Sequence, residues 1–242
     1  MHSKSKSGDW WCWCLSIFNL YDFFSLFFSF GLFYVISSII VKLGGFSLIN
    51  LVPSVPLQFI IVFLLADLKH YLWHRFMHIN PFWELHKYHH SATELNLITA
   101  FRGHFLEKGV GTIFDGILFS ILGTPIVQFN TLQIGKQFYD QLIHSDINWS
   151  LGWVGRHILI SPKTHKIHHS SQPEFYDKNF GTFFVFWDKI FGTYINTDKK
   201  ITIGVNGYVT KGFWMDMFEG NRSFISAVLK LIKPKKYNSS IK

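Results

Sequence analysis

Histidine is the residue type that sets the chemistry of this chain of 242 residues. Of its 13 histidines, 12 lie between residues 70 and 169. Neutral imidazole is a ligand for iron, zinc, copper and nickel, so a dense group of histidines predicts a transition-metal site without naming the metal. Three clusters carry this prediction: His74/His78, His86/His89/His90 and His165/His168/His169.

The spacing within the clusters is typical of helices whose histidines share a face. His70, His74 and His78 recur every four residues. Residues three or four apart on a helix are neighbours, with about 5–6 Å between their Cβ atoms. The pattern HxxHH occurs twice, ending at His90 and at His169, and a proline precedes the second copy where a helix would begin. Each cluster is therefore expected to present its rings from one side of one helix.

The number of rings predicts two metal ions. The clusters supply eight imidazoles and His144 is a candidate ninth, whereas one ion rarely takes more than about six ligands. His70 either extends the first cluster or faces solvent. His2, His104 and His157 are interpreted as surface or satisfied core residues.

Carboxylates near the clusters are expected to orient the ligands by accepting the second ring N–H. The candidates are Asp67, Glu84, Glu107, Asp177 and Asp188. Asp67 stands two turns before His74 and shares its face, which favours it for this role. The alternative is that Asp67 only interacts with the positive end of its helix.

The composition indicates that these clusters belong to a membrane protein. Hydrophobic residues make up 48% of the chain and charged residues only 16%, against about a quarter charged in an average soluble domain. Lysines account for most of the net charge of +8; many stand at the ends of apolar runs and in the tail, which suits anionic headgroups and predicts no nucleic-acid partner. The two cysteines, Cys12 and Cys14, are too few for a disulfide framework or a structural zinc site.

Three apolar runs, 23–41, 55–66 and 109–127, and a less hydrophobic segment, 129–143, must position the histidines. They predict two membrane hairpins, the second kinked and with its polar residues facing inward. Two hairpins place the N-terminus and both His-rich regions on one face, which the lysine bias makes cytoplasmic. The expected fold is a single all-α domain over 1–242, an integral-membrane bundle of about four membrane helices capped by a cytoplasmic His-rich helical domain.

The two ends of the chain are interpreted separately. Trp10, Trp11 and Trp13 are typical of an aromatic belt at a membrane surface. No small-residue cleavage site follows the first apolar run, so the N-terminus is expected to be retained. Residues 222–233 form either a basic amphipathic helix lying on the membrane surface or an ordinary solvated terminal helix.

With these residues in place, the chain resembles the fatty acid hydroxylase/sterol desaturase superfamily over about residues 60–195. Within it, the resemblance is to the sterol desaturase-like branch that includes alkylglycerol monooxygenase. The matching pieces are Asp67…His74-Arg-Phe-Met-His78, Trp83-Glu-Leu-His86-Lys-Tyr-His89-His90-Ser91, Asn96-Leu-Ile-Thr-Ala-Phe-Arg102, Pro162-Lys-Thr-His165-Lys-Ile-His168-His169, Asp177-Lys-Asn179-Phe-Gly181 and Trp187-Asp188-Lys-Ile-Phe-Gly192-Thr193.

The resemblance implies a di-iron enzyme that uses O2 to hydroxylate or desaturate a membrane lipid such as a sterol, a fatty acyl chain or an ether lipid. It implies that the eight clustered histidines and His144 hold two iron ions, which zinc can replace by misloading, and that Asn179 and Asp188 support them. An external donor, which would be a small haem carrier, a ferredoxin or a reduced pterin, must supply electrons. Two other functions stay open: a zinc-dependent membrane hydrolase with Glu84 as general base, and a non-catalytic metal-binding or lipid-binding protein.

Overall fold

The computed structural model describes residues 30–43 and 47–232, and in these ranges every element is helical. Two isolated β-bridges, Leu159 with Phe184 and Ser170 with Ile203, occur there without any strand. This confirms the all-α fold class for the described part of the chain. The tryptophans and cysteines of residues 10–14, His2 and the start of the first apolar run lie outside it.

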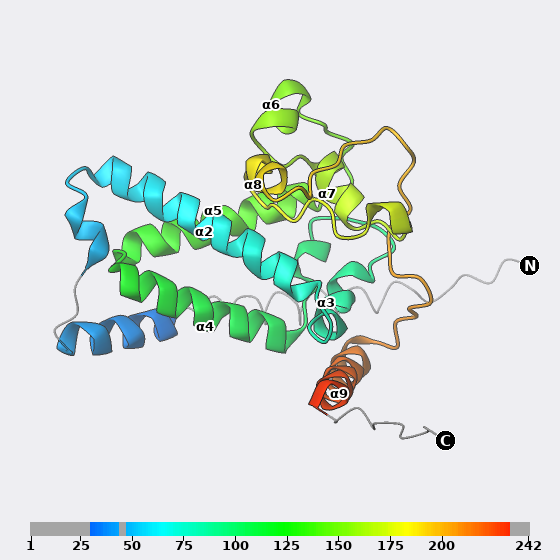
Figure 1. Ribbon diagram of the computed structural model, residues 1–242, viewed down its shortest axis with the longest axis horizontal. Helices are drawn as coiled ribbons and strands as arrows, with labels where there is room; N and C mark the ends of the chain where they lie inside the picture. Colours follow the sequence, from blue (N-terminus) through cyan, green and yellow to red (C-terminus); the bar gives the residue numbers. More distant parts are fainter. Residues whose placement is uncertain (1–29, 44–46, 233–242) are drawn as a thin grey trace, which may run out of the picture.

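Four long helices form the body of the protein (Figure 1). They are the helix whose described part is Phe30–Lys42, α2 (Val55–Met77), α4 (Phe105–Leu122) and α5 (Ile126–Ile143). Short elements gather at one end of them: α3 (Trp83–His90), η2 (Thr99–Phe101), α6 (Gly152–His157), α7 (Pro162–His168), η3 (Pro173–Phe175) and α8 (Val185–Ile190). The remaining elements are η1 (Leu48–Leu51) and the C-terminal α9 (Phe213–Ile232).

The turn between α4 and α5 lies earlier than the apolar pattern predicts. The expected run 109–127 continues past it, but α4 ends at Leu122, because Gly123 adopts a left-handed conformation with φ of 69°. A Cβ atom on Gly123 would come within 2.2 Å of Ser47 Oγ, so only glycine fits this turn. Pro125 then precedes the first turn of α5.

The apolar core lies between the long helices. Phe33 stacks on Phe129, with ring centroids 4.4 Å apart, and Phe119 and Val62 pack into the same buried cluster. The Ser37 and Ser120 hydroxyls are hydrogen bonded at 2.9 Å inside this region. These contacts hold the Phe30–Lys42 helix against α4 and α5.

Toward the histidine end of the bundle, α4 and α5 turn polar residues inward and apolar residues outward. Asp115 is buried and pairs with Lys69 of α2 at 2.6 Å, whereas Phe114, Ile117 and Phe138 are exposed. The prediction that the polar residues of these helices face inward is confirmed. Among the described residues, only α2 is both long and apolar enough to cross a membrane.

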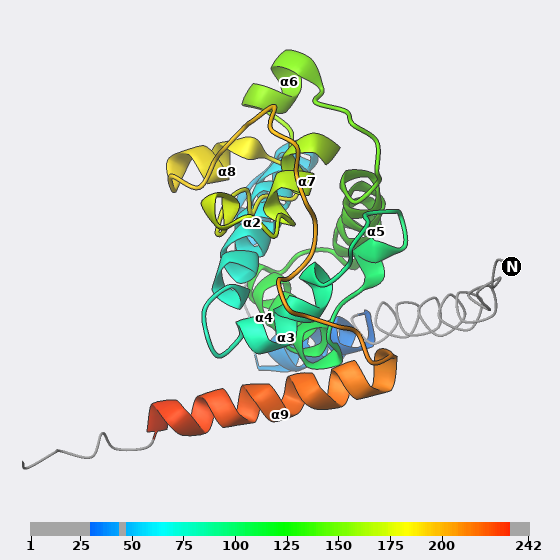
Figure 2. The same cartoon turned by 90° about the vertical axis from the view of Figure 1, so that its right-hand side faces the viewer.

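Helix α9 runs crosswise to the long helices at the end where α3 lies (Figure 2). It packs on α3, and His104, which caps the start of α4, is hydrogen bonded to it. His104 accepts from Leu106 N at Nδ1 and donates from Nε2 to Met217 O at 3.0 Å. A Cβ on Gly220 would come within 2.9 Å of the His104 ring, so glycine is required at this crossing. His104 is thus a satisfied core residue, as predicted.

Candidate metal centre

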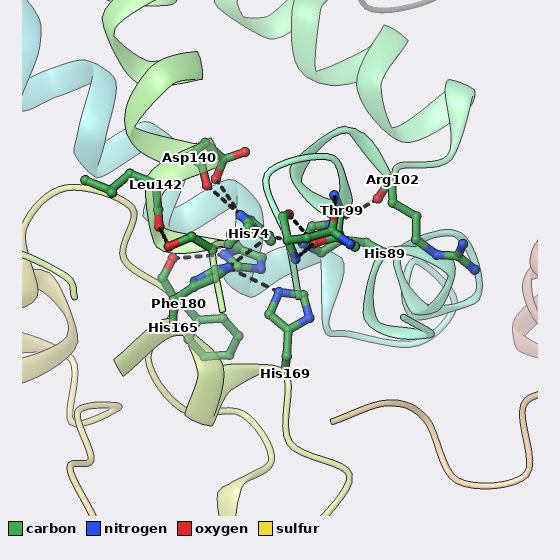
Figure 3. A network of polar contacts seen from close by, with 12 residues as sticks. His74, His89, Thr99, Arg102, Asp140, Leu142, His165, His169 and Phe180 are labelled. Carbon is green, nitrogen blue, oxygen red and sulfur yellow. Dashed lines mark hydrogen bonds and ion pairs between the residues drawn. The ribbon is translucent and has the colours of Figure 1, made fainter. Parts of the chain in front are cut away.

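The described structure brings the nine predicted ligand residues together at one end of the bundle. They form two groups, and within each group the candidate ligand atoms all lie within 4.8 Å of one another. The first group is His74, His78, His86, His90 and His168. The second group is His89, His144, His165 and His169. Figure 3 shows members of both groups pointing toward one another from α2, α3 and α7.

Each HxxHH cluster is divided between the two groups. Helix α3 gives His86 and His90 to the first group and His89 to the second. Helix α7 gives His168 to the first group and His165 to the second, and His169, the residue that follows α7, also joins the second. The groups are therefore interleaved and touch: the His90 and His169 rings stack with centroids 4.4 Å apart. The sequence predicted two ions but not this division.

The nitrogen spacing in the second group fits a single ion. His144 Nε2 lies 3.2 Å from His89 Nε2 and 3.0 Å from His165 Nε2, and His169 Nε2 lies 3.1 Å from His165 Nε2. Two nitrogens bound to one ion at about 2.1 Å, with an angle between 90° and the tetrahedral value, stand about 2.9–3.4 Å apart. In the first group His90 Nε2 is 3.2 Å from both His78 Nε2 and His86 Nε2.

Carboxylates and carbonyls fix the tautomers of the first group. The Nδ1–H of His86 donates to Glu107 Oε1 at 2.7 Å, and that of His78 donates to Asp177 Oδ1 at 3.2 Å. His74 donates to the Phe180 carbonyl at 2.9 Å. An Nδ1 proton held by an oxygen leaves Nε2 unprotonated, which is the state a metal ligand requires.

Three further rings are fixed in the same way by backbone carbonyls. His89 donates to Arg102 O, His144 to Asp140 O and His168 to Lys178 O, each at 2.7 Å. In the pair His89 and His144, two lone pairs then face each other with no proton between them. A cation between the rings removes this repulsion.

Two buried atoms of the first group complete the fit to a metal ion. The Nε2 atoms of His74 and His168 are buried and have no hydrogen-bond partner, although buried polar atoms are nearly always satisfied. Their ring centroids lie 4.4 Å apart. A metal ion would satisfy both.

Burial favours the neutral form of six of these rings. It lowers the pKa of His78 to about 4. Burial also lowers the pKa values of five other histidines well below the ordinary 6.5: His89, His90, His165, His168 and His169. Neutral imidazole is the metal-binding form, so the environment favours metal over proton at this site.

Asp67 and Asp188 support the site through the 180–184 loop, without touching a ligand ring. Asp188 accepts from Phe180 N at 2.8 Å and from Gly181 N at 2.9 Å, and it is the Phe180 carbonyl that contacts His74. Asp67 accepts from Phe183 N, Phe184 N and Trp187 Nε1. The expectation that Asp67 accepts directly from a ligand ring is therefore wrong, because the loop amides occupy both of its oxygens.

Two other residues expected to support the ligands, Asn179 and Glu84, do not contact a histidine of either group. Asn179 is fully buried at a positive φ of 56°, and its amide bonds Thr164 O and Ile195 O, which ties the loop to α7. Glu84 instead pairs with Lys87 and lines a separate cavity beneath α9. Glu107 and Asp177, two of the five carboxylates named from the sequence, are the ones that contact candidate ligand rings.

A cavity of about 430 Å³ opens beside the histidine groups, between α2, α4 and α5. Its wall includes His74, His86, His89, His144 and His165. His70 also lines it and stays outside both groups, so His70 faces the cavity rather than bulk solvent. His157 is exposed on α6, away from the cavity.

Comparison with known proteins places the histidine region in a recognised family. A family model described as fatty acid hydroxylase matches residues 59–193, more than half of the chain. No solved structure matches at a significant level.

The similar proteins are named after enzymes of several different lipids. Alkylglycerol monooxygenase of Xenopus tropicalis is 30% identical over 175 residues, 70% of this chain and 38% of that protein. Ornithine lipid hydroxylase OlsE of Rhizobium tropici is 29% identical over 159 residues, 64% of this chain and 48% of that protein. Sphingolipid C4-hydroxylase sur2 of Schizosaccharomyces pombe is 29% identical over 148 residues, 57% of this chain and 48% of that protein. The aligned part of the chain thus covers less than half of each of these relatives.

Proposed function

The chain belongs to the fatty acid hydroxylase family, and from this premise we propose that it is a di-iron enzyme that inserts one atom of O2 into a C–H bond of a membrane lipid. The observation that carries the proposal is the pair of interleaved histidine groups, whose Nε2 atoms have the spacing of ligands around single ions. His74, His78, His86, His90 and His168 would hold one ion and the other four histidines the second. Bound iron supplies the activation of O2.

The reaction fixes what else the protein needs. Hydroxylation converts RH, O2, two electrons and two protons into ROH and water, so an external donor must supply the electrons. The proposed donor is a small haem carrier, a ferredoxin or a reduced pterin. The names of the relatives, a monooxygenase and two hydroxylases, favour hydroxylation over desaturation.

The side chains of this chain contribute binding and positioning. Glu107, Asp177 and the backbone carbonyls hold the ring N–H groups, so the ligand nitrogens stay aimed at the ions. Asp188 holds the loop that carries the Phe180 carbonyl. The cavity beside His74 and His144 gives the lipid a route to the ions.

We also propose two membrane hairpins: the helix ending at Lys42 with α2, and α4 with α5. The apolar outer faces and polar interior of α4 and α5 support this, because lipid-facing surfaces must be apolar. Helix α9 would lie on the cytoplasmic surface beside the metal centre. Its crosswise direction (Figure 2) and its exposed Trp214, Phe218 and Leu229 support that placement.

The zinc-hydrolase alternative is weakened by Glu84. A hydrolytic general base must reach a metal-bound water, whereas Glu84 pairs with Lys87 and lines the cavity beneath α9. The carboxylate that does line the main cavity beside the histidines is Glu107, and its Oε1 accepts from His86. Dependence on O2 and on a reductant separates the two functions.

The test uses the full chain purified in detergent and loaded with iron. We expect two irons per chain and incorporation of one ¹⁸O atom from ¹⁸O2 into a lipid when a reductant is present. His168→Ala should lose iron from the first group and all oxygen incorporation. His157→Ala, a surface histidine on α6, is the matched control and should keep both. Full activity of His168→Ala, or turnover without O2, would contradict the proposal.

A further inference from the structure

Helices α6 and α8 expose apolar side chains on the side of the histidine region opposite α9 (Figures 1 and 2). The two helices pack against each other, and the residues that flank them pair in the antiparallel bridge of Leu159 with Phe184. Six side chains in and beside these helices are between 38% and 66% exposed and are called the α6–α8 face: Trp149, Trp153, Val154, Ile158, Ile190 and Phe191. A surface with this many exposed apolar side chains marks a contact site.

The charged side chains of the two helices are sorted by sign. Arg156 of α6 and Lys189 of α8 are exposed, whereas Asp188 is fully buried and accepts from the amides of Phe180 and Gly181. Neither helix exposes a carboxylate. Exposed tryptophans beside cations are typical of a protein surface that meets the headgroups of anionic lipids.

Aromatic contacts place α8 beside α2, the described helix that is long and apolar enough to cross a membrane. The ring centroids of Phe63 and Phe183 are 4.9 Å apart, and Tyr71 stacks on Phe191 at 5.1 Å. Phe63 and Tyr71 lie about 12 Å and 24 Å along the helix axis from Val55, where α2 begins. Both contacts therefore fall within the ~30 Å of a hydrocarbon core.

A non-helical segment at that depth must satisfy its backbone polar groups within the protein. The buried Asp67 carboxylate of α2 accepts from Phe183 N and Phe184 N at 3.1 Å, and from Trp187 Nε1 at 2.9 Å. The Phe183 carbonyl accepts from Ile160 N at 2.8 Å. A carboxylate on a membrane helix is costly unless it has such partners. Asp67 thus lets the segment before α8 lie against α2 without exposing bare amides to lipid.

We propose that the α6–α8 face lies in the bilayer interface, against the headgroups and upper acyl chains of anionic lipids. The inference rests on the proposed membrane placement of α2 and adds a second surface contact to that of α9. Figure 1 shows α8 nearly end-on and Figure 2 shows it side-on, so α8 runs crosswise to the long helices, as α9 does. Crosswise helices with an apolar face are the form of an interfacial anchor. The two anchors hold the histidine region to the bilayer from opposite sides.

An electron-donor protein and a second copy of the chain are the competing partners for an apolar face. A soluble donor approaches from water and does not reach the depth of Tyr71 when α2 spans the bilayer. A second copy would bury the face in protein and would exclude both lipid and water. The surroundings of a label on the face therefore distinguish the three partners.

Fluorescence quenching on the full, iron-loaded chain in vesicles of phosphatidylcholine and phosphatidylglycerol tests the proposal. Cys12 and Cys14 are first replaced by serine, since they are the only cysteines of the chain. One fluorophore is then attached in Trp153→Cys and, in a separate variant, in Ile190→Cys. Two quenchers are compared: phosphatidylcholine with a nitroxide on its acyl chain, and iodide in the water.

Two reference positions calibrate the measurement. Ile60→Cys labels an exposed position of α2 within the proposed span, and Asp198→Cys labels a fully exposed surface residue. We expect the ratio of lipid quenching to iodide quenching to be highest at Ile60 and lowest at Asp198. The ratios at Trp153 and Ile190 should lie between these limits and clearly above that at Asp198.

The other outcomes overturn the proposal in distinguishable ways. Ratios at Trp153 and Ile190 equal to that at Asp198 would place the face in water while α2 stays in the membrane. Weak quenching by both agents would assign the face to a second copy of the chain. A water-exposed Ile60 would reject the membrane placement itself. Iron content and ¹⁸O incorporation are measured on the same samples, so the proposed enzyme can fail while the lipid contact stands.

Discussion

The Nε2 atoms of His89 and His144 lie 3.2 Å apart, although 55 residues separate them in sequence. Each ring gives its Nδ1 proton to a backbone carbonyl, His89 to Arg102 and His144 to Asp140. Neither Nε2 therefore carries a proton, and the contact is not a hydrogen bond. The relationship makes α5 part of the candidate metal centre, and it predicts the effect of removing His144.

His144→Ala should remove one metal ion and leave the other. The second group would keep three rings, whereas the first group contains no residue of α5. We expect the iron content to fall from two toward one per chain and oxygen incorporation to fall at least about 100-fold, the upper range for a disturbed metal site. Elemental analysis with His157→Ala as control checks this. Two tightly held ions in the variant would contradict the assignment of His144.

Glu107→Gln should weaken the first group without emptying it. An amide oxygen can still accept from His86 Nδ1–H, but it lacks the charge that strengthens the present 2.7 Å contact. We expect about 10-fold to 100-fold weaker metal binding in a competition with a chelator. Glu174→Gln, a partner of Lys199 at the surface, should bind metal as the natural chain does. An unchanged Glu107→Gln would show that the carboxylate does not support His86.

Asp188→Asn should loosen the 180–184 loop. Asp188 accepts from two amides and from Thr193 Oγ1, and an asparagine has only one acceptor oxygen, so at least one buried donor loses its partner. A loss of about 1–3 kcal/mol is expected, seen as a lower unfolding temperature. Asp198→Asn, whose carboxylate is fully exposed, should have no such effect. The same unfolding temperature in both variants would contradict the role of Asp188.

The metal-free protein should lose stability as the pH falls below about 6.5. Burial lowers the pKa of His78 to about 4 and lowers the pKa values of His168 and His169 well below their ordinary value. Between the folded and unfolded pKa values the unfolded chain binds more protons, so acid favours unfolding by up to about 1.4 kcal/mol per ring and pH unit. Unfolding temperatures at pH 7.5 and 5.5 check the sign. Equal values would show that the rings take up protons within the fold.

Local sequence determined the type of site and the parts that build it. Spacings of three and four residues place rings on one helical face because an α-helix advances about 100° per residue. The two HxxHH patterns with HxxxH predict two ions. The family resemblance also follows from these local motifs. The all-α fold and the inward-facing polar residues of α4 and α5 were predictable because apolar runs and helical periodicity are short-range signals.

Tertiary structure decided how the rings are shared and what holds them. The three histidines of α3 stand at different angles around the helix axis. Which of them joins which group depends on where α2, α5 and α7 lie. Four of the groups that hold ring protons are backbone carbonyls, at Arg102, Asp140, Lys178 and Phe180. Every residue has a carbonyl, so no residue type marks these four. Asp67 was misassigned for a similar reason: its helical face was correct, but the loop amides that reach it come from residues 183 and 184, more than 100 positions away.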